Sequence, residues 1–400
     1  MTKSDRLASL DVLRGLAVAG MILVVSPGDW SQRYVQLDHA DWNGATLADM
    51  VFPAFLFSVG FALGLSFPRP LRTLAERRRF WTRLLRRTAV LILLGLAVEA
   101  SFVIEMAMMG PFSDGGGWLA HIRIPGILQR IGLCYGLAGA LTYATAIHET
   151  DDTAKLNPRA IAVTAALILV GYWLVLVLVP VPGFGAGELT PEGNLPGFID
   201  RTLFTEPHLW PLGSATGSRP ATYDPEGLLS TLPATVDVLC GILAAWAWKR
   251  DAETAVFRIA ISGMILVIVG LALDPVIVIN KRIWTSSFAL VSGGISALTL
   301  AVLAVALRNR AIKAVATPLR ILGGNAILAF LLSTITSRFA GLPIFAEDGR
   351  RLTPQMWGFH RALAIVSDQR LASLLCAVAV LALVTCAIWP LHRRAIHFRI

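Results

Sequence analysis

The chain has 400 residues, of which 55% are hydrophobic and only 15% are charged. So few charges could not cover the apolar surface of a soluble protein of this length, which excludes an ordinary soluble globular protein. The net charge of +9 could indicate a nucleic-acid partner. However, the basic residues stand in short runs between apolar segments, which is the pattern of cytoplasmic loops in membrane proteins. We therefore expect a membrane protein with no nucleic-acid partner.

Apolar runs of about 20 residues recur along the whole chain, long enough to cross the hydrocarbon core of a bilayer. Backbone groups in lipid must be paired internally, and the alternating pattern of barrel strands is missing, so we expect helices. The predicted fold is an all-α polytopic bundle of about ten transmembrane helices. The predicted spans are Leu10–Ser26, Ala45–Leu65, Thr88–Met108, Ile124–Ile147, Ala160–Val181, Leu228–Trp248, Ile259–Ile279, Ile283–Leu307, Leu319–Thr336 and Leu371–Leu391. We expect the first apolar run to be a retained span and not a cleaved signal.

The distribution of Lys and Arg predicts the orientation. If the N-terminus is cytoplasmic, the terminal segments and the loops 67–87, 148–159, 249–258 and 308–320 hold 22 of the 35 basic residues, against ten in the outer segments. Cytoplasmic loops carry the excess of basic residues, so both termini are predicted to be cytoplasmic. We expect a multi-pass protein of the bilayer, in the inner or plasma membrane if the source is prokaryotic.

We treat residues 1–400 as a single transmembrane domain, to whose functional site the outer loops 27–44, 110–123, 182–227 and 337–370 contribute. The loop 182–227 is too long for a simple connector, and long ordered loops tend to be functional. The four cysteines lie in apolar stretches without CxxC spacing, so we expect neither a disulfide nor a metal site.

The first outer loop brings a histidine close to several carboxylates in sequence. Asp38, His39 and Asp41 precede the second predicted helix, and Asp49 lies near its start. A histidine beside carboxylates has the composition of a general base with an orienting partner. The alternative is a solvated loop in which Asn43 or Thr46 caps the helix.

The remaining candidates also carry two interpretations. Arg130 lies two turns inside the fourth predicted span, where a cation is costly unless paired. It could pair with Glu105, Asp237 or Asp274, or it could bind an anionic ligand. Tyr223, Asp224 and Glu226 could form a site or only an Asp-Pro turn before a helix. Lys281, Arg282 and Trp284 could instead be snorkelling cations and an interfacial tryptophan. Asp11 and Arg14 are expected to form a local ion pair.

Six blocks, in order, resemble one known family. They read SLDVLRGLAVAGMIL, DHADWNGATLADMVFPAFLFSVG, RIPGILQRIGLCY, PGFGAGELTPEGNLPGFIDRTLF, YDPEGLLSTL and INKRIWTSSFAL. The chain is similar over nearly its whole length to the heparan-α-glucosaminide N-acetyltransferase family. Compared with the animal lysosomal enzyme, we expect this chain to be the membrane core alone. Where the family often has Asn at the outer end of the first span, this sequence has Val25 and Ser26.

The resemblance implies transfer of an acetyl group from cytosolic acetyl-CoA, as co-substrate and without a metal, to an amine or hydroxyl of an amino sugar or envelope glycan outside. The catalytic histidine of the family's HAxWNG block falls on His39. Either His39 deprotonates the acceptor in a ternary complex, which we prefer, or it takes the acetyl group itself. The candidate donor- and acceptor-binding residues are Ser26, Asp41, Trp42, Asn43, Asp49, Arg123, Gln129, Arg130, Tyr223, Asp224, Glu226, Lys281 and Trp284.

Two other function classes stay open at this point. One is a small-molecule or sugar transporter that uses the same polar residues, for which Asp237 and Asp274 are buried-acid candidates. The other is a non-catalytic membrane partner subunit, which the Val25 and Ser26 departure leaves open. A homodimer is a further open question. Release of CoA from acetyl-CoA in the presence of an amino sugar would separate an enzyme from both.

Overall fold

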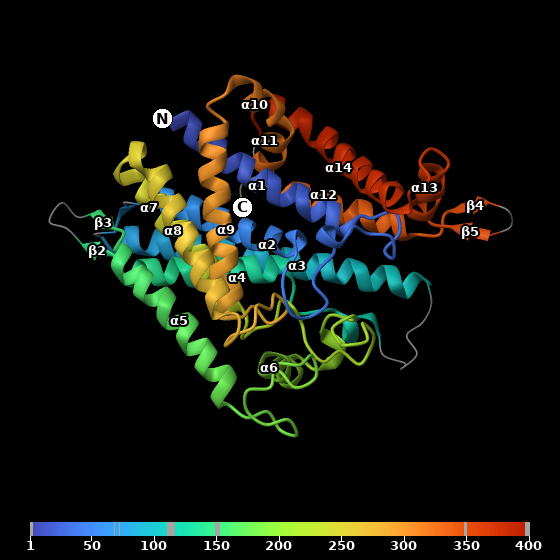
Figure 1. Ribbon diagram of the computed structural model, residues 1–400, viewed down its shortest axis with the longest axis horizontal. Helices are drawn as coiled ribbons and strands as arrows, with labels where there is room; N and C mark the ends of the chain where they lie inside the picture. Colours follow the sequence, from blue (N-terminus) through green and yellow to red (C-terminus); the bar gives the residue numbers. More distant parts are fainter. Residues whose placement is uncertain are drawn as a thin grey trace. The chain divides into compact units, whose positions relative to one another are not determined.

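The computed structural model describes residues 3–67, 69–71, 73–109, 117–148, 153–347 and 350–396 (Figure 1). Its chain divides into two compact units. The first unit comprises residues 1–41, 45–55 and 302–399, and the second comprises mainly residues 42–44 and 56–301. Each unit is helical, with one small antiparallel sheet in each.

The first unit consists of α1 and the C-terminal helices, together with the beginning of α2. Its elements are α1 (Lys3–Val25), η1 (Val35–Leu37), the start of α2 (Leu47–Leu65), α10 (Arg310–Val315), α11 (Thr317–Gly324), α12 (Ala326–Gly341), β4 (Phe345–Glu347), β5 (Arg350–Leu352), α13 (Pro354–Leu363) and α14 (Gln369–Arg393). Strand β4 pairs antiparallel with β5, with Ala346 opposite Arg351. The predicted outer segment 337–370 therefore holds a hairpin and a short helix between two longer helices.

Helix α1 crosses α11 closely at two glycines. A Cβ on Gly15 would lie 1.8 Å from the carbonyl oxygen of Leu319, and one on Gly323 would lie 1.8 Å from that of Asp11. Only glycine permits this approach of two backbones. Arg14 Nη1 donates to the Gly323 carbonyl at 3.2 Å and lies 3.8 Å from Asp11 Oδ1. The predicted local ion pair is therefore confirmed, and it borders the contact between the two helices.

The second unit is built around α7. Its elements are α3 (Leu74–Met109), η2 (Trp118–His121), α4 (Ile127–Ala144), α5 (Pro158–Leu178), α6 (Leu195–Phe204), η3 (Glu206–His208), α7 (Thr231–Arg250), α8 (Ala252–Leu273), most of α9 (Ser286–Ala306) and the short strands β1 (Arg69–Pro70), β2 (Ile147–His148) and β3 (Thr153–Lys155) in the order β1-β3-β2. Helix α7 packs against α4, α5 and α8. Helices α5 and α8 expose apolar faces, with Leu167 at 67% and Ile268 at 58%, as expected for contact with lipid.

Seven described helices are long and apolar enough to cross a membrane. They are α1, α2, α5, α7, α8, α9 and α14. The ninth predicted span is not one straight helix, because α11 and α12 meet at Asn325 with a bend of 92°. If this bent pair counts as one span, the number is eight. The third predicted span falls within α3, and the fourth, Ile124–Ile147, extends beyond α4 at both ends; neither helix belongs to this set. The all-helical, multi-pass class is confirmed.

Candidate functional site

His39 and Asp49 are joined by a short hydrogen bond in the first unit. His39 Nδ1 lies 2.7 Å from Asp49 Oδ1. The Asp49 side chain is 1% exposed, whereas the His39 side chain is 28% exposed. Asp49 stands in the first turn of α2, where the helix dipole favours a negative charge. The arrangement therefore combines an orienting carboxylate with a partly accessible imidazole.

The same carboxylate closes the loop that carries the histidine. Asp49 Oδ2 accepts hydrogen bonds from the backbone N–H groups of Ala40 and Thr46, at 3.1 and 2.9 Å, and from the Thr46 hydroxyl. Thr46 immediately precedes α2 and also donates its hydroxyl to the Asp38 carbonyl. Asp49 thus returns to the start of its helix as a capping-box residue does. The predicted cap at Thr46 fits this geometry, and the cap is combined with the site.

Asp38 and Asp41 are closer to His39 in sequence than Asp49 is, but they have other roles. Asp38 accepts the backbone N–H of His39 at 2.8 Å and pairs with Arg33 at 2.6 Å. Asp41 is exposed and forms no hydrogen bond or ion pair within the described part of the chain. The partner of the imidazole is therefore Asp49, ten residues later. Ser26, at the end of α1, is buried, and its hydroxyl lies 3.0 Å from that of Ser337 in α12.

In the second unit, Arg123 holds two buried carboxylates. Its Nε donates to Asp224 Oδ2 at 2.8 Å, and its Nη2 contacts both Asp224 Oδ1 and Glu226 Oε2 at 2.5 Å. Burial alone would raise the pKa of Glu226, but the charges of Arg123, Lys281 and Arg130 outweigh it and lower the pKa to about 2. This network joins the beginning of α4 to the turn before α7. These predicted site residues bind one another.

Arg130 is fully buried in α4. Its Nη2 donates to the Gly227 carbonyl at 2.9 Å and to the Ser230 hydroxyl, and its guanidinium carbon lies 5.2 Å from the centroid of the Trp284 ring. Its Nε and Nη1 have no hydrogen-bond partner among the described residues. A buried guanidinium with unused donors has the chemistry of an anion site.

The predicted ion pair of Arg130 with Asp237 or Asp274 is not formed. Asp237 Oδ2 instead accepts Trp284 Nε1 at 3.1 Å, and Asp274 accepts the backbone N–H of Ile279 at 2.7 Å. The side chain of Glu105, the third candidate partner, lies outside the described residues. Tertiary packing therefore places a tryptophan ring between Arg130 and its predicted acidic partner.

The segment around Lys281 is packed inside the second unit and is not a simple surface hairpin. Trp284 is fully buried, so the alternative of an interfacial tryptophan is wrong. Lys281 is only 8% exposed. Asn280 Nδ2 donates to Asn43 Oδ1 at 3.2 Å, and Gly44 donates its N–H to the Ile279 carbonyl at 2.7 Å. This backbone pairing fixes the Trp42–Gly44 stretch against the segment.

Aromatic and amide side chains complete the surroundings. The rings of Trp42 and Tyr223 lie 4.8 Å apart in a T-shaped arrangement, and Trp42 Nε1 donates to the Leu189 carbonyl at 2.8 Å. Gln129 is buried at the start of α4 and donates to the Ile124 carbonyl at 3.1 Å. Trp42 and Tyr223 therefore lie together, whereas Gln129 supports the beginning of its own helix.

Sequence reasoning missed Asp200, which lies fully buried in α6. Its Oδ1 accepts the backbone N–H of Leu228 at 2.9 Å, and its Oδ2 has no hydrogen-bond partner within the described ranges. Burial raises the pKa of Asp200 to about 7. Nothing in the local sequence marks this residue, because its burial depends on the packing of residues 227–228 against α6.

No group of three or more His, Cys, Asp or Glu side chains is arranged to hold a metal ion in the part of the chain that the structure describes. The described residues offer an imidazole–carboxylate pair in the first unit and buried cations in the second.

Comparison with known proteins gives one consistent result. Residues 6–174 match the family described as heparan-alpha-glucosaminide N-acetyltransferase, catalytic. The chain is 31% identical over 316 residues to heparan-alpha-glucosaminide N-acetyltransferase of Homo sapiens, covering 71% of this chain and 46% of that protein. It is 29% identical over 323 residues to the Mus musculus enzyme of the same name, covering 72% of this chain and 47% of that protein.

The chain thus spans less than half the length of these two relatives, and its own long apolar helices are those of an integral multi-pass membrane protein. The matched region includes His39, Asp49, Arg123 and Arg130. The resemblance expected from the six sequence blocks is confirmed. Residues 6–174 thus resemble the heparan-α-glucosaminide N-acetyltransferase catalytic-domain family, and the similarity to the human and mouse proteins extends over about 70% of this chain.

Proposed function

We propose that this chain transfers the acetyl group of cytosolic acetyl-CoA to an amine or hydroxyl of an amino sugar or envelope glycan on the opposite side of the membrane. The observation that carries the proposal is the 2.7 Å contact between His39 Nδ1 and Asp49 Oδ1. A carboxylate at Nδ1 fixes the orientation and tautomer of the ring, so that Nε2 on its opposite edge is the basic nitrogen.

The preferred mechanism is direct transfer in a ternary complex. His39 Nε2 takes the proton of the acceptor amine while the amine nitrogen attacks the thioester carbonyl carbon. Collapse of the tetrahedral intermediate breaks the carbon–sulfur bond and releases CoA, whose thiolate accepts a proton. The buried Asp49 carboxylate stabilises the imidazolium that forms between these events. The alternative route forms acetyl-His39 first and passes the acetyl group to the acceptor in a second step.

The donor needs cationic contacts for its phosphates. We infer that Arg130 supplies one of them, because two of its nitrogens lack protein partners within the described residues. Lys281, nearly buried and close enough to Glu226 to lower its pKa, is a second candidate. Trp42, Asn43 and Tyr223, which lie together in the second unit, are proposed contacts of the donor or acceptor.

The proposed topology has ten spans with both termini cytoplasmic. It adds α3, α4 and the bent pair α11–α12 to the seven apolar helices. The excess of basic residues in the segments assigned to the cytoplasm supports this orientation. It places the loop carrying His39 outside, on the side of the proposed acceptor.

One observation favours a transporter as the second candidate function. Helices α11 and α12 are separated by a single residue and bent by 92°. Broken helices of this kind form substrate sites in many transporters. A transporter would move a sugar across sealed vesicles without consuming acetyl-CoA, and a non-catalytic partner subunit would do neither.

The deciding experiment measures CoA release by the purified full chain from acetyl-CoA with and without glucosamine or an envelope glycan. We expect acceptor-dependent release that falls roughly 10²–10⁴-fold in His39→Ala, the usual effect of losing a general base. His360→Ala, which removes an exposed histidine of α13 that is not among the candidate site residues, is the matched control and should retain activity. A change of less than about threefold in folded His39→Ala would disprove the role of His39.

A further inference from the structure

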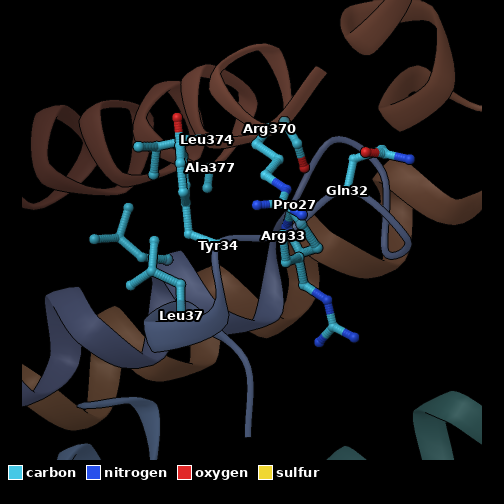
Figure 2. Close-up of a pocket in the computed structure, with 10 residues that line it drawn as sticks. Pro27, Gln32, Arg33, Tyr34, Leu37, Arg370, Leu374 and Ala377 are labelled. Carbon is cyan, nitrogen blue, oxygen red and sulfur yellow. The ribbon is translucent and has the colours of Figure 1, made fainter. Parts of the chain in front are cut away.

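A small pocket lies in the first unit, where α1 ends and α14 begins (Figure 2). Its apolar wall consists of Leu23, Leu37, Leu374 and Ala377. Its polar wall includes Arg33, Tyr34 and Arg370. Figure 2 shows the Arg370 side chain extending from α14 toward Pro27 and Arg33. A hydrocarbon wall next to guanidinium groups matches a ligand with an anionic head and an apolar chain.

The charge of this pocket is positive. Arg33 is neutralised by Asp38, which lies 2.6 Å from its Nη1. Arg370 is exposed and forms no ion pair or hydrogen bond with any described residue. The nearby Asp368 carboxylate accepts the backbone N–H of Leu371 as the cap of α14. Arg370 is thus the cation that protein groups leave available, and guanidinium binds phosphate with two parallel hydrogen bonds.

The pocket stands at the level expected for lipid headgroups. Both α1 and α14 are long and apolar enough to span a bilayer, and the pocket joins the end of one to the start of the other. Leu23 belongs to the last turns of α1, and Leu374 and Ala377 belong to the first turns of α14. An acyl chain on these residues would run along the apolar helices while its phosphate stays at the interface.

We propose that this pocket binds an anionic phospholipid of the surrounding bilayer, with the phosphate on Arg370 and an acyl chain on Leu23 and Leu374. Because Arg33 holds Asp38, whose carboxylate accepts the His39 N–H, an occupied pocket would steady the loop that carries His39. Lipid binding at this pocket does not require that the chain transfers acetyl groups.

The test compares phosphatidylglycerol with phosphatidylcholine of the same acyl chains, titrated into the purified full chain in detergent. Lipid binding is measured by native mass spectrometry, and thermal unfolding is followed in parallel. We expect phosphatidylglycerol to bind more tightly and to raise the unfolding temperature. Arg370→Gln should weaken this binding by roughly tenfold, the scale of one charged hydrogen-bond pair. Arg361→Gln, at an exposed arginine of α13 outside the pocket, should retain it.

Three results would overturn the proposal. The first is equal binding of the two lipids, and the second is unchanged phosphatidylglycerol binding in Arg370→Gln. The third is equal protection by inorganic phosphate, which would show that the apolar wall is not used. If Arg370→Gln does not fold, Arg370→Lys, which keeps the charge but loses the planar fork, provides the same comparison with a smaller change.

Discussion

His39 and Asp49 are separated by ten residues, yet the imidazole Nδ1 lies 2.7 Å from the carboxylate Oδ1. Asp49 makes this contact with one oxygen while its other oxygen binds the backbone of Ala40 and Thr46. One carboxylate therefore positions the ring and also holds the loop that bears it. This double use determines how substitutions at Asp49 should behave.

Asp49→Asn should lower turnover by at least about tenfold while acetyl-CoA binding persists, because an amide cannot stabilise the imidazolium as a carboxylate does. The amide oxygen can still accept one hydrogen bond, so we expect a folded protein. Steady-state CoA release as a function of pH checks this, since loss of the carboxylate should also shift the acidic limb of the profile. Full activity with an unaltered pH profile would show that Asp49 serves the loop alone.

Arg130→Met should weaken acetyl-CoA binding by roughly tenfold or more if the unused guanidinium nitrogens meet a phosphate. Isothermal titration with acetyl-CoA gives the affinity, and the unfolding temperature reports the fold. Arg130→Lys is the companion variant, because it keeps the charge but loses the planar fork. An unstable Arg130→Met protein whose folded fraction binds acetyl-CoA normally would identify Arg130 as purely structural.

Asp200 should make stability fall as the pH rises. Burial raises its pKa in the folded protein to about 7, from an ordinary value of 3.8. The folded state therefore holds the proton more tightly, and stability is lost progressively from about pH 4 to above pH 7. Asp200→Asn, neutral at every pH and still able to accept the Leu228 N–H, should unfold at a higher temperature than the native chain at pH 8. Thermal unfolding from pH 5 to 8 measures this. A pH dependence identical to that of the native chain would contradict it.

Arg123→Met should lower the free energy of unfolding by about 3–5 kcal/mol, the usual cost of removing one partner of a buried ion pair. It leaves Asp224 and Glu226 buried without their cation. The matched control is Arg219→Met, because the side chains of the Arg219–Glu206 pair are 38% and 30% exposed and the pair should contribute less than about 1 kcal/mol. Chemical denaturation in one detergent compares the two. Equal effects would mean that the buried network adds nothing beyond a surface pair.

The same network predicts loss of stability in acid. Glu226 has a pKa of about 2 in the folded protein and an ordinary value of 4.5. Its contribution is complete above about pH 4.5 and disappears as the pH falls toward 2. Glu226→Gln should therefore flatten the acid side of the stability profile. An unchanged acid limb would argue against the lowered pKa.

The proposed orientation predicts that a cysteine at exposed position 41 is labelled from outside and that one at position 83 is not. The four native cysteines are first replaced, and an impermeant maleimide is applied to intact cells before and after permeabilisation. The run Arg77–Arg87 is the densest part of the basic bias, so position 83 tests it directly. Labelling of position 41 only after permeabilisation would reverse the assignment.

The sequence by itself determined the helical membrane class and most helix positions. Predicted Ala45–Leu65 corresponds to α2 at Leu47–Leu65, and predicted Ala160–Val181 to α5 at Pro158–Leu178. The physical reason is local: a run of apolar residues that must satisfy its own backbone in lipid has almost no choice but a helix. His39 was likewise marked by its HADWNG block, because a motif is contiguous in sequence.

Only the tertiary structure decided the partners. Asp41 is nearer to His39 in sequence, but the turn into α2 brings Asp49 to the ring. Trp284 has the composition of an interfacial residue, yet it is buried beneath Arg130 and bonded to Asp237. Asp200 became a buried acid through packing against residues 227–228. Hydrogen bonds and burial between distant segments depend on how helices pack, and hydropathy along one segment carries no record of its neighbours.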